Sequence, residues 1–241
     1  MTNVVLVHGA WHGGWCYREC ARALRSRGHT VFTPSFSGNA EHRHRAHHSI
    51  TLEDHIRDIL GVFEAEEIDD AVLVGHSYGG MVITGVADRI PDKIRHLVYL
   101  DAFVPENGDS LNDLLPRALA PEAALAFLNG FRGSAAEHHS MMTSPIPAAL
   151  FGVKPENQAW VDRRCHPQSL ATFEMPLLLG GAASRLHKLY ILADAWDPSP
   201  FRHFAAKLTE APGWKVVNLP CGHDVMVDMP LELAELIMTV V

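Results

Sequence analysis

The sequence predicts an α/β domain built on a mostly parallel sheet of about six strands. Two observations lead to this fold class. The first half of the chain alternates short apolar runs with helical patterns, and the same alternation returns near the C-terminus. The chain has 241 residues, of which 47% are hydrophobic and 20% charged, enough for a substantial core and too few charges for disorder.

The expected elements follow one another in a regular order. Strands are identified as short apolar runs, and helices by their spacing and by end signals such as Thr51 and Gly28. The expected strands are 3–9, 29–35, 70–75, 94–103, 187–194 and 214–220. The expected helices are 15–28, 50–66, 79–90, 199–211 and a last one from about Pro230.

The alternation breaks after the fourth expected strand. The segment that follows is rich in Pro, Ala, Met and Phe, with helical stretches but no clear strand. We expect residues 1–104 and 187–241 to form the core and residues 105–186 to form a helical cap or lid. Apolar side chains in and next to this segment suit a lid over an apolar pocket and equally suit the lid's own small core: Phe103, Phe127, Phe131, Met141, Met142, Phe151 and Trp160.

Charge and cysteine content argue against several classes of protein. The net charge of −8 provides no basic surface for nucleic acid or an anionic membrane. The four cysteines lack a metal-ligand spacing and suit a reducing compartment: Cys16, Cys20, Cys165 and Cys221. With no signal peptide and no membrane-length apolar run in the sequence, we expect a soluble cytoplasmic protein. The oligomeric state, a homodimer included, stays open.

The stretch VLVGHSYGGM, residues 72–81, passes abruptly from a buried strand into glycine. Its middle has the pattern Gly-x-Ser-x-Gly around Ser77, between an expected strand and an expected helix. That context is typical of a nucleophile elbow, in which small neighbours let the backbone turn sharply. The alternative is a serine in an ordinary strand-to-helix connection.

A nucleophilic serine needs a base and an oxyanion site. His223 stands in a Gly-His loop directly after the last expected strand, which is where this architecture carries its base. The loop LVHGAWHGGW after the first strand can offer the Ala10 N–H, and the residue after the nucleophile offers the Tyr78 N–H. The alternatives are a surface histidine and a glycine-rich connection without a role.

Four segments together resemble the α/β-hydrolase superfamily: LVHGAWHGGWCY, GHSYGGMV, LVYLDAFVPENGDSL and LPCGHDVMVDMP. The closer resemblance is to the branch of plant methylesterases, hydroxynitrile lyases and bacterial carboxylesterases of the pyrethroid-hydrolase kind. It covers nearly the whole chain, most firmly residues 3–110 and 187–240. It implies an α/β-hydrolase fold with a lid after the fourth strand.

The resemblance also implies cofactor-free catalysis by a Ser-His-Asp triad. Ser77 would attack a carbonyl, His223 would take and return the proton, and an Asp would orient the imidazole. Hydroxynitrile lyases of this type carry Thr after the first-strand His and Lys after the catalytic His, whereas this chain has Gly9 and Asp224. We therefore expect hydrolysis of a small to medium carboxylic ester with an apolar portion, with lyase chemistry or a non-catalytic ligand receptor as the alternatives.

Two residues compete for the role of the acid. Asp197, in ILADAWDPSPF, follows the strand after the insertion, where this fold usually carries its acid, and the Pro and Phe beyond it match the family best. Asp101, in VYLDAF, lies at the tip of the strand after the nucleophile helix, a position that some α/β-hydrolases use instead. Asp194 is a lesser candidate. We favour Asp197 and keep Asp101 as the alternative.

Other histidines and cysteines suggest metal sites only at first sight. The segment AEHRHRAHHSI holds four histidines but interleaves them with Arg43 and Arg45, which would repel a cation. Cys16 and Cys20 lie one helical turn apart and suit core filling. His12 could contact substrate or pack. We expect no metal and no cofactor.

Overall fold

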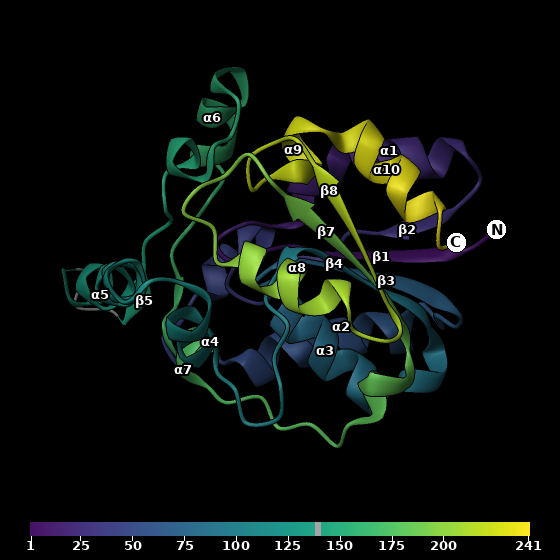
Figure 1. Ribbon diagram of the computed structural model, residues 1–241, viewed down its shortest axis with the longest axis horizontal. Helices are drawn as coiled ribbons and strands as arrows, with labels where there is room; N and C mark the ends of the chain where they lie inside the picture. The colour runs from purple at the N-terminus through teal and green to yellow at the C-terminus, as the bar shows by residue number, and fades with distance from the viewer. Residues whose placement is uncertain (138–140) are drawn as a thin grey trace.

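The computed structural model describes residues 1–137 and 141–241. Its main sheet has six strands, all parallel, in the order β2-β1-β3-β4-β7-β8 (Figure 1). The strands are β1 (Asn3–Val7), β2 (Thr30–Phe32), β3 (Ala71–Ser77), β4 (Ile94–Ala102), β7 (His187–Ala193) and β8 (Trp214–Leu219). The predicted fold class is confirmed, and the six expected strands each overlap an observed one.

Helices cover both faces of this sheet. One face carries α1 (Arg18–Ser26), α9 (Val225–Asp228) and α10 (Pro230–Met238), and the other carries α2 (Leu52–Ala65), α3 (Gly79–Arg89) and α8 (Phe201–Thr209) (Figure 1). Successive side chains of a strand point to opposite faces. Val5 and Val7 therefore belong to one hydrophobic cluster and Val4 and Leu6 to the other. This double burial explains why the strands are apolar without alternation.

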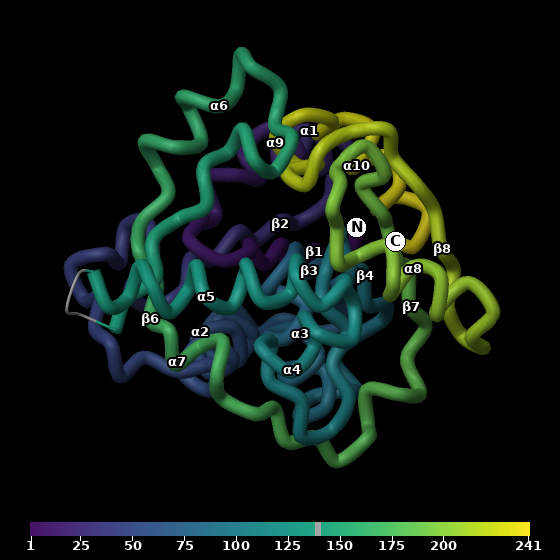
Figure 2. Tube along the Cα trace, turned by 60° about the vertical axis from the view of Figure 1, so that its left-hand side comes forward, coloured from purple at the N-terminus to yellow at the C-terminus, as the bar shows by residue number. Residues whose placement is uncertain are grey.

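The segment between β4 and β7 holds α4 (Leu111–Ala118), α5 (Pro121–Glu137), α6 (Pro155–Asp162) and α7 (Ala171–Glu174). It also holds a two-stranded antiparallel pair, β5 (Met142–Thr143) with β6 (Gln168–Ser169), which the sequence did not predict because each strand has only two residues. Figure 1 shows these helices at the end of the sheet away from both termini, and Figure 2 is turned so that this side comes forward. Since β1 starts near the N-terminus and the strands are parallel, their carboxyl ends face this segment.

Within the described residues, the structure contains no helix that is both long and apolar enough to cross a membrane.

The sheet is irregular where β3 and β4 end. His76 pairs with Leu100, but Ser77 pairs with Ala102, so Asp101 has no partner in the register. Asp101 has a φ of +42°, and Ser77 has a φ of +54°. Both values lie in the left-handed region that non-glycine residues rarely adopt. An extra residue with such a backbone is a β-bulge, a device that re-aims a side chain beside a site.

Close backbone contacts hold the turn after β3. A Cβ at Gly80, in the first turn of α3, would lie 2.1 Å from the carbonyl oxygen of Phe103. We predict that Gly80→Ala lowers the free energy of unfolding by about 2 kcal/mol or more, because backbone must move to admit the methyl group. Chemical denaturation measures this change.

The matched control is Gly61→Ala, inside α2, where a Cβ would meet nothing within 4 Å. Alanine should stabilise this exposed helical position by about 1 kcal/mol. Equal stability of the two variants would show that the turn does not require the close approach at Gly80.

Candidate active site

Ser77 is the last residue of β3, and α3 begins two residues later at Gly79. Its left-handed backbone makes the chain turn sharply, so that the Ser77 side chain follows neither the direction of the strand side chains nor that of the helix side chains. Ser77 and His223 line the same cavity, which lies at the carboxyl end of the sheet. The structure thus brings together the two residues that the sequence analysis assigned to one site.

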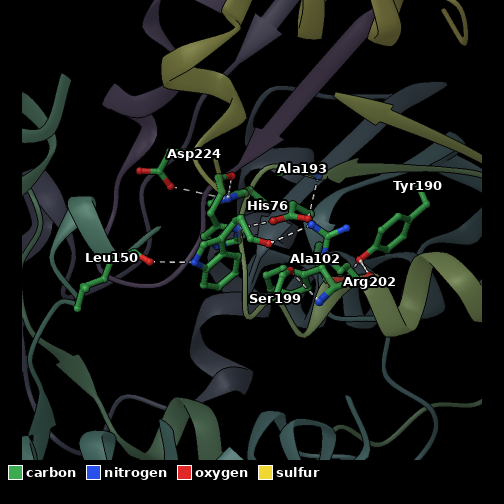
Figure 3. Close-up of polar contacts among 12 residues, drawn as sticks. His76, Ala102, Leu150, Tyr190, Ala193, Ser199, Arg202 and Asp224 are labelled. Carbon is green, nitrogen blue, oxygen red and sulfur yellow. Dashed lines mark hydrogen bonds and ion pairs between the residues drawn. The ribbon is translucent and has the colours of Figure 1, made fainter. Parts of the chain in front are cut away.

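His223 contacts Asp101 directly. The distance between His223 Nδ1 and Asp101 Oδ2 is 2.7 Å, and both side chains are buried. The second oxygen of Asp101 accepts a hydrogen bond of 3.0 Å from the N–H of Ala193, at the end of β7 (Figure 3). With both oxygens engaged, the carboxylate is held in one orientation toward the imidazole.

Asp197, the acid that the sequence favoured, lies exposed at the surface. Asp194 is half-buried, and the Nδ1 atom of His223 is already occupied by Asp101. The structure thus brings Asp101, and not Asp197, to the imidazole. The physical reason is the β4 bulge, which turns Asp101 out of the strand register.

Aromatic rings enclose the imidazole of His223. Phe201 stacks on it at 5.0 Å with an interplanar angle of 10°, and Trp196 and Phe151 lie 4.8 and 5.0 Å away. Burial in these surroundings lowers the pKa of His223 from 6.5 to about 3. The ring is therefore neutral at pH 7, so that Nδ1–H donates to Asp101 and Nε2 is free to accept a proton.

Ala10 and Tyr78, the residues expected to supply the oxyanion site, line the same cavity. Across residues 1–137 and 141–241, neither of their backbone N–H groups donates a hydrogen bond. His8 Nδ1–H donates to the carbonyl of Gly9 at 2.7 Å, and the N–H of Phe36 donates to His8 Nε2 at 3.1 Å. Because C=O and N–H point in opposite directions across a trans peptide, the His8 contact helps to direct the Ala10 N–H.

Side chains from the segment between β4 and β7 supply much of the cavity wall. Of the aromatic residues considered from the sequence, four line the cavity: Phe103, Phe127, Phe131 and Phe151. Trp11 and Phe173 add to the same wall. Trp160 instead packs against Trp15 and the guanidinium groups of Arg18 and Arg164, and Met141 is exposed. The cavity thus favours a largely apolar ligand.

The remaining histidine and cysteine clusters lie away from the cavity or are already engaged. His44, His47 and His48 are exposed, while Cys16 and Cys20 are buried in the hydrophobic core. In the part of the chain that the structure describes, the one group close enough to share a metal ion is His76, His223 and Asp224. Three of its atoms have partners within the protein: His223 Nδ1 contacts Asp101, Asp224 Oδ2 contacts His12, and His76 Nε2 contacts the carbonyl of His223, whereas His76 Nδ1 and Asp224 Oδ1 have no hydrogen-bond partner among the described residues.

The comparisons with known proteins agree with this fold. A family model described as the alpha/beta hydrolase family matches residues 4–236. A carbendazim hydrolyzing esterase from Nocardioides sp. (strain SG-4G) is 63% identical over 98% of this chain and 98% of its own. A pyrethroid hydrolase from Sphingobium wenxiniae is 27% identical over 98% of this chain and 86% of its own.

Solved structures include an extracellular α/β-hydrolase from a Paenibacillus species that is described as sharing structural and functional homology with tobacco salicylic acid binding protein 2. Its TM-score is 0.84 at 23% identity, covering 100% of this chain and 99% of that one, which supports the fold. The chain belongs to the α/β-hydrolase family. The prediction of an esterase of this family is confirmed.

Four buried histidines predict a loss of stability in acid. Burial lowers the pKa of each below 6.5, to about 4 for His55 and about 3 for His223, and well below the usual value for His8 and His76. The unfolded chain therefore binds more protons than the folded chain as the pH falls through 6.5. We predict that these four histidines lower the free energy of unfolding from pH 7 to pH 5, each by up to about 1.4 kcal/mol per pH unit as the unfolded imidazole becomes protonated.

Denaturant titrations at several pH values measure this slope. In His55→Gln, the number of protons taken up on unfolding should fall by about one, because the variant has no imidazole that becomes charged on unfolding. The free energy of unfolding should therefore depend less steeply on pH. A pH dependence in His55→Gln as steep as that of the wild type would contradict the buried neutral state of His55.

Proposed function

We propose that this esterase hydrolyses a carboxylic ester through a triad of Ser77, His223 and Asp101. The observation that carries the proposal is the 2.7 Å contact between His223 Nδ1 and Asp101 Oδ2, beside a serine whose φ is +54° in the same cavity. The N–H groups of Ala10 and Tyr78 are the proposed oxyanion site. No metal or cofactor enters the proposed reaction.

The proposed reaction has two halves. Ser77 Oγ attacks the ester carbonyl while its proton passes to His223 Nε2, and the oxyanion of the tetrahedral adduct binds the N–H groups of Ala10 and Tyr78. Collapse of the adduct breaks the bond to the leaving alcohol, which takes the proton from His223. Water then attacks the acyl-enzyme by the same route, releasing the carboxylic acid and restoring Ser77.

Asp101 has two tasks in this scheme. Its carboxylate fixes the tautomer of His223 with the proton on Nδ1, and it stabilises the imidazolium that forms during each half-reaction. The aromatic surroundings of His223 exclude water and strengthen this interaction. Asp197 is exposed, which supports a surface role for that residue.

The proposed substrate is an ester or carbamate with an aromatic group. The cavity wall is mostly aromatic, and a planar ring packs well against such side chains. The esterase that is 63% identical acts on carbendazim according to its name, so carbendazim is the first compound to test. We further propose that residues 105–186 act as a lid over this cavity.

We propose a cytoplasmic location for the protein. The four cysteines are all free thiols in the structure, as suits a reducing compartment.

We predict that Ser77→Ala lowers turnover of both a short-chain nitrophenyl ester and carbendazim by about a thousandfold or more. Wild-type protein should also show a burst of nitrophenol, since the acyl-enzyme accumulates. A binding protein without catalysis would show no burst, and a lyase would cleave mandelonitrile instead. Retention of more than a tenth of wild-type turnover by Ser77→Ala would remove that serine from the nucleophile's role.

The acid is tested by two Asn substitutions measured side by side. Asp101→Asn should lower turnover by about ten-thousandfold, by analogy with the corresponding substitution in serine proteases, because the imidazole then carries its proton on the wrong nitrogen. Asp197→Asn should stay near the wild-type rate. The opposite order of the two variants would move the role to Asp197.

A further inference from the structure

A buried ion pair lies beneath the active site and takes no part in the proposed proton transfers. His12 Nε2 lies 3.1 Å from Asp224 Oδ2, with both side chains almost fully buried. Asp224 directly follows His223 in the sequence, and His12 stands two residues after Ala10. The pair therefore joins the loop that carries the proposed base to the loop that carries one proposed oxyanion N–H. Asp224 also lies beside His76 (Figure 3).

The surroundings favour the charged form of both members of this pair. Burial alone would lower the pKa of His12, but Cys165 and Asp224 together raise it well above 6.5. Burial would raise the pKa of Asp224, but the adjacent His12 lowers it far below its usual value. Removing one partner of a buried pair leaves an uncompensated charge. The contact is thus a firm link between the two loops.

The second ring nitrogen of His12 reaches the oxyanion loop. His12 Nδ1–H donates to the carbonyl of Ala10 at 2.8 Å. The same peptide unit is held from its other side, since the N–H of Trp11 donates to Gln168 Oε1 at 3.0 Å. Trp11 has a φ of +64°, a conformation that a bulky residue keeps only when its surroundings enforce it. The peptide between Ala10 and Trp11 is therefore fixed at both of its polar groups.

Fixing this peptide limits rotation at Ala10, because the preceding peptide is held as well. His8 binds the carbonyl of Gly9, which belongs to the peptide whose N–H is that of Ala10. With peptides on both sides of Ala10 anchored, the direction of its N–H is determined by His8 on one side and by His12 and Gln168 on the other. A displacement of about 1 Å in such a donor is enough to cost catalysis.

We propose that His12 and Asp224 are positioning residues for the oxyanion site: their ion pair aims the Ala10 N–H and holds the oxyanion loop in register with His223. This inference rests on the proposed esterase mechanism. In this proposal Asp224 acts on the oxyanion site and not on the imidazole of His223. The Nδ1 atom of His223 is already hydrogen-bonded to Asp101. A merely structural ion pair would contribute to stability without a preference for the transition state.

The test compares Asp224→Leu with Asp224→Asn. Leucine removes both the charge and the hydrogen bond to His12, whereas asparagine can still donate to a neutral imidazole. The matched control is Asp228→Leu, since Asp228 is a partly buried carboxylate of the same region that binds the backbone N–H of Lys154 and the amide of Asn157. Complete labelling with a fluorophosphonate counts the active sites, so that misfolded protein does not enter the rates.

For Asp224→Leu we expect kcat per active site to fall about 10- to 100-fold with KM within threefold, because only transition-state binding is lost. A trifluoromethyl ketone, whose serine adduct places an oxyanion in the site, should lose affinity by the same factor, while a non-reacting alcohol product should bind as before. Asp224→Asn should have a kcat per active site at least tenfold higher than that of Asp224→Leu. Asp228→Leu should keep the wild-type kcat even where it unfolds at a lower temperature.

A kcat per active site within twofold of wild type for Asp224→Leu would overturn the inference. An equal loss of affinity for the ketone and the alcohol would overturn it as well, because the ion pair would then shape the pocket in general. The proposed mechanism fails separately, if the turnover of the wild-type protein does not depend on Ser77.

Discussion

Two neighbouring strands each have a residue with a left-handed backbone at or next to their last position, and the site depends on that pair. Ser77 at the end of β3 and Asp101 near the end of β4 have φ values of +54° and +42°. The register slips by one residue between them, which leaves Asp101 as a bulge. Without the bulge, Asp101 would continue the strand alternation, and its carboxylate would not meet Nδ1 of His223.

Buried polar groups lie next to the aromatic cavity. They place the imidazoles of His223 and His12 in different electrostatic surroundings. Around His223, burial among aromatic rings keeps the imidazole neutral and therefore basic. Around His12, Cys165 and the adjacent carboxylate of Asp224 raise the pKa of the imidazole. The two histidines lie on loops joined by the contact between His12 and Asp224, so the loop that carries the proton acceptor is held by a buried ion pair.

Much of this arrangement could be predicted from the sequence because it is local. The strands are continuous apolar runs, Ser77 has glycine on both sides of its turn, and His223 follows the last strand. The acid could not be chosen correctly, since a bulge leaves no mark in VYLDAF, while Asp197 stands in a turn that resembles the usual position. The link between His12 and Asp224 spans 212 positions, and no pattern along the chain records such a contact.

The hydrogen bond from His223 to Asp101 can be observed directly by proton NMR. A proton held between a buried imidazole nitrogen and a carboxylate resonates strongly downfield of the amide region. We expect one such resonance from His223 Nδ1–H that survives in Asp197→Asn and disappears in Asp101→Asn, with both variants folded. A resonance that persists in Asp101→Asn and vanishes in Asp197→Asn would show that Asp197, and not Asp101, holds the imidazole.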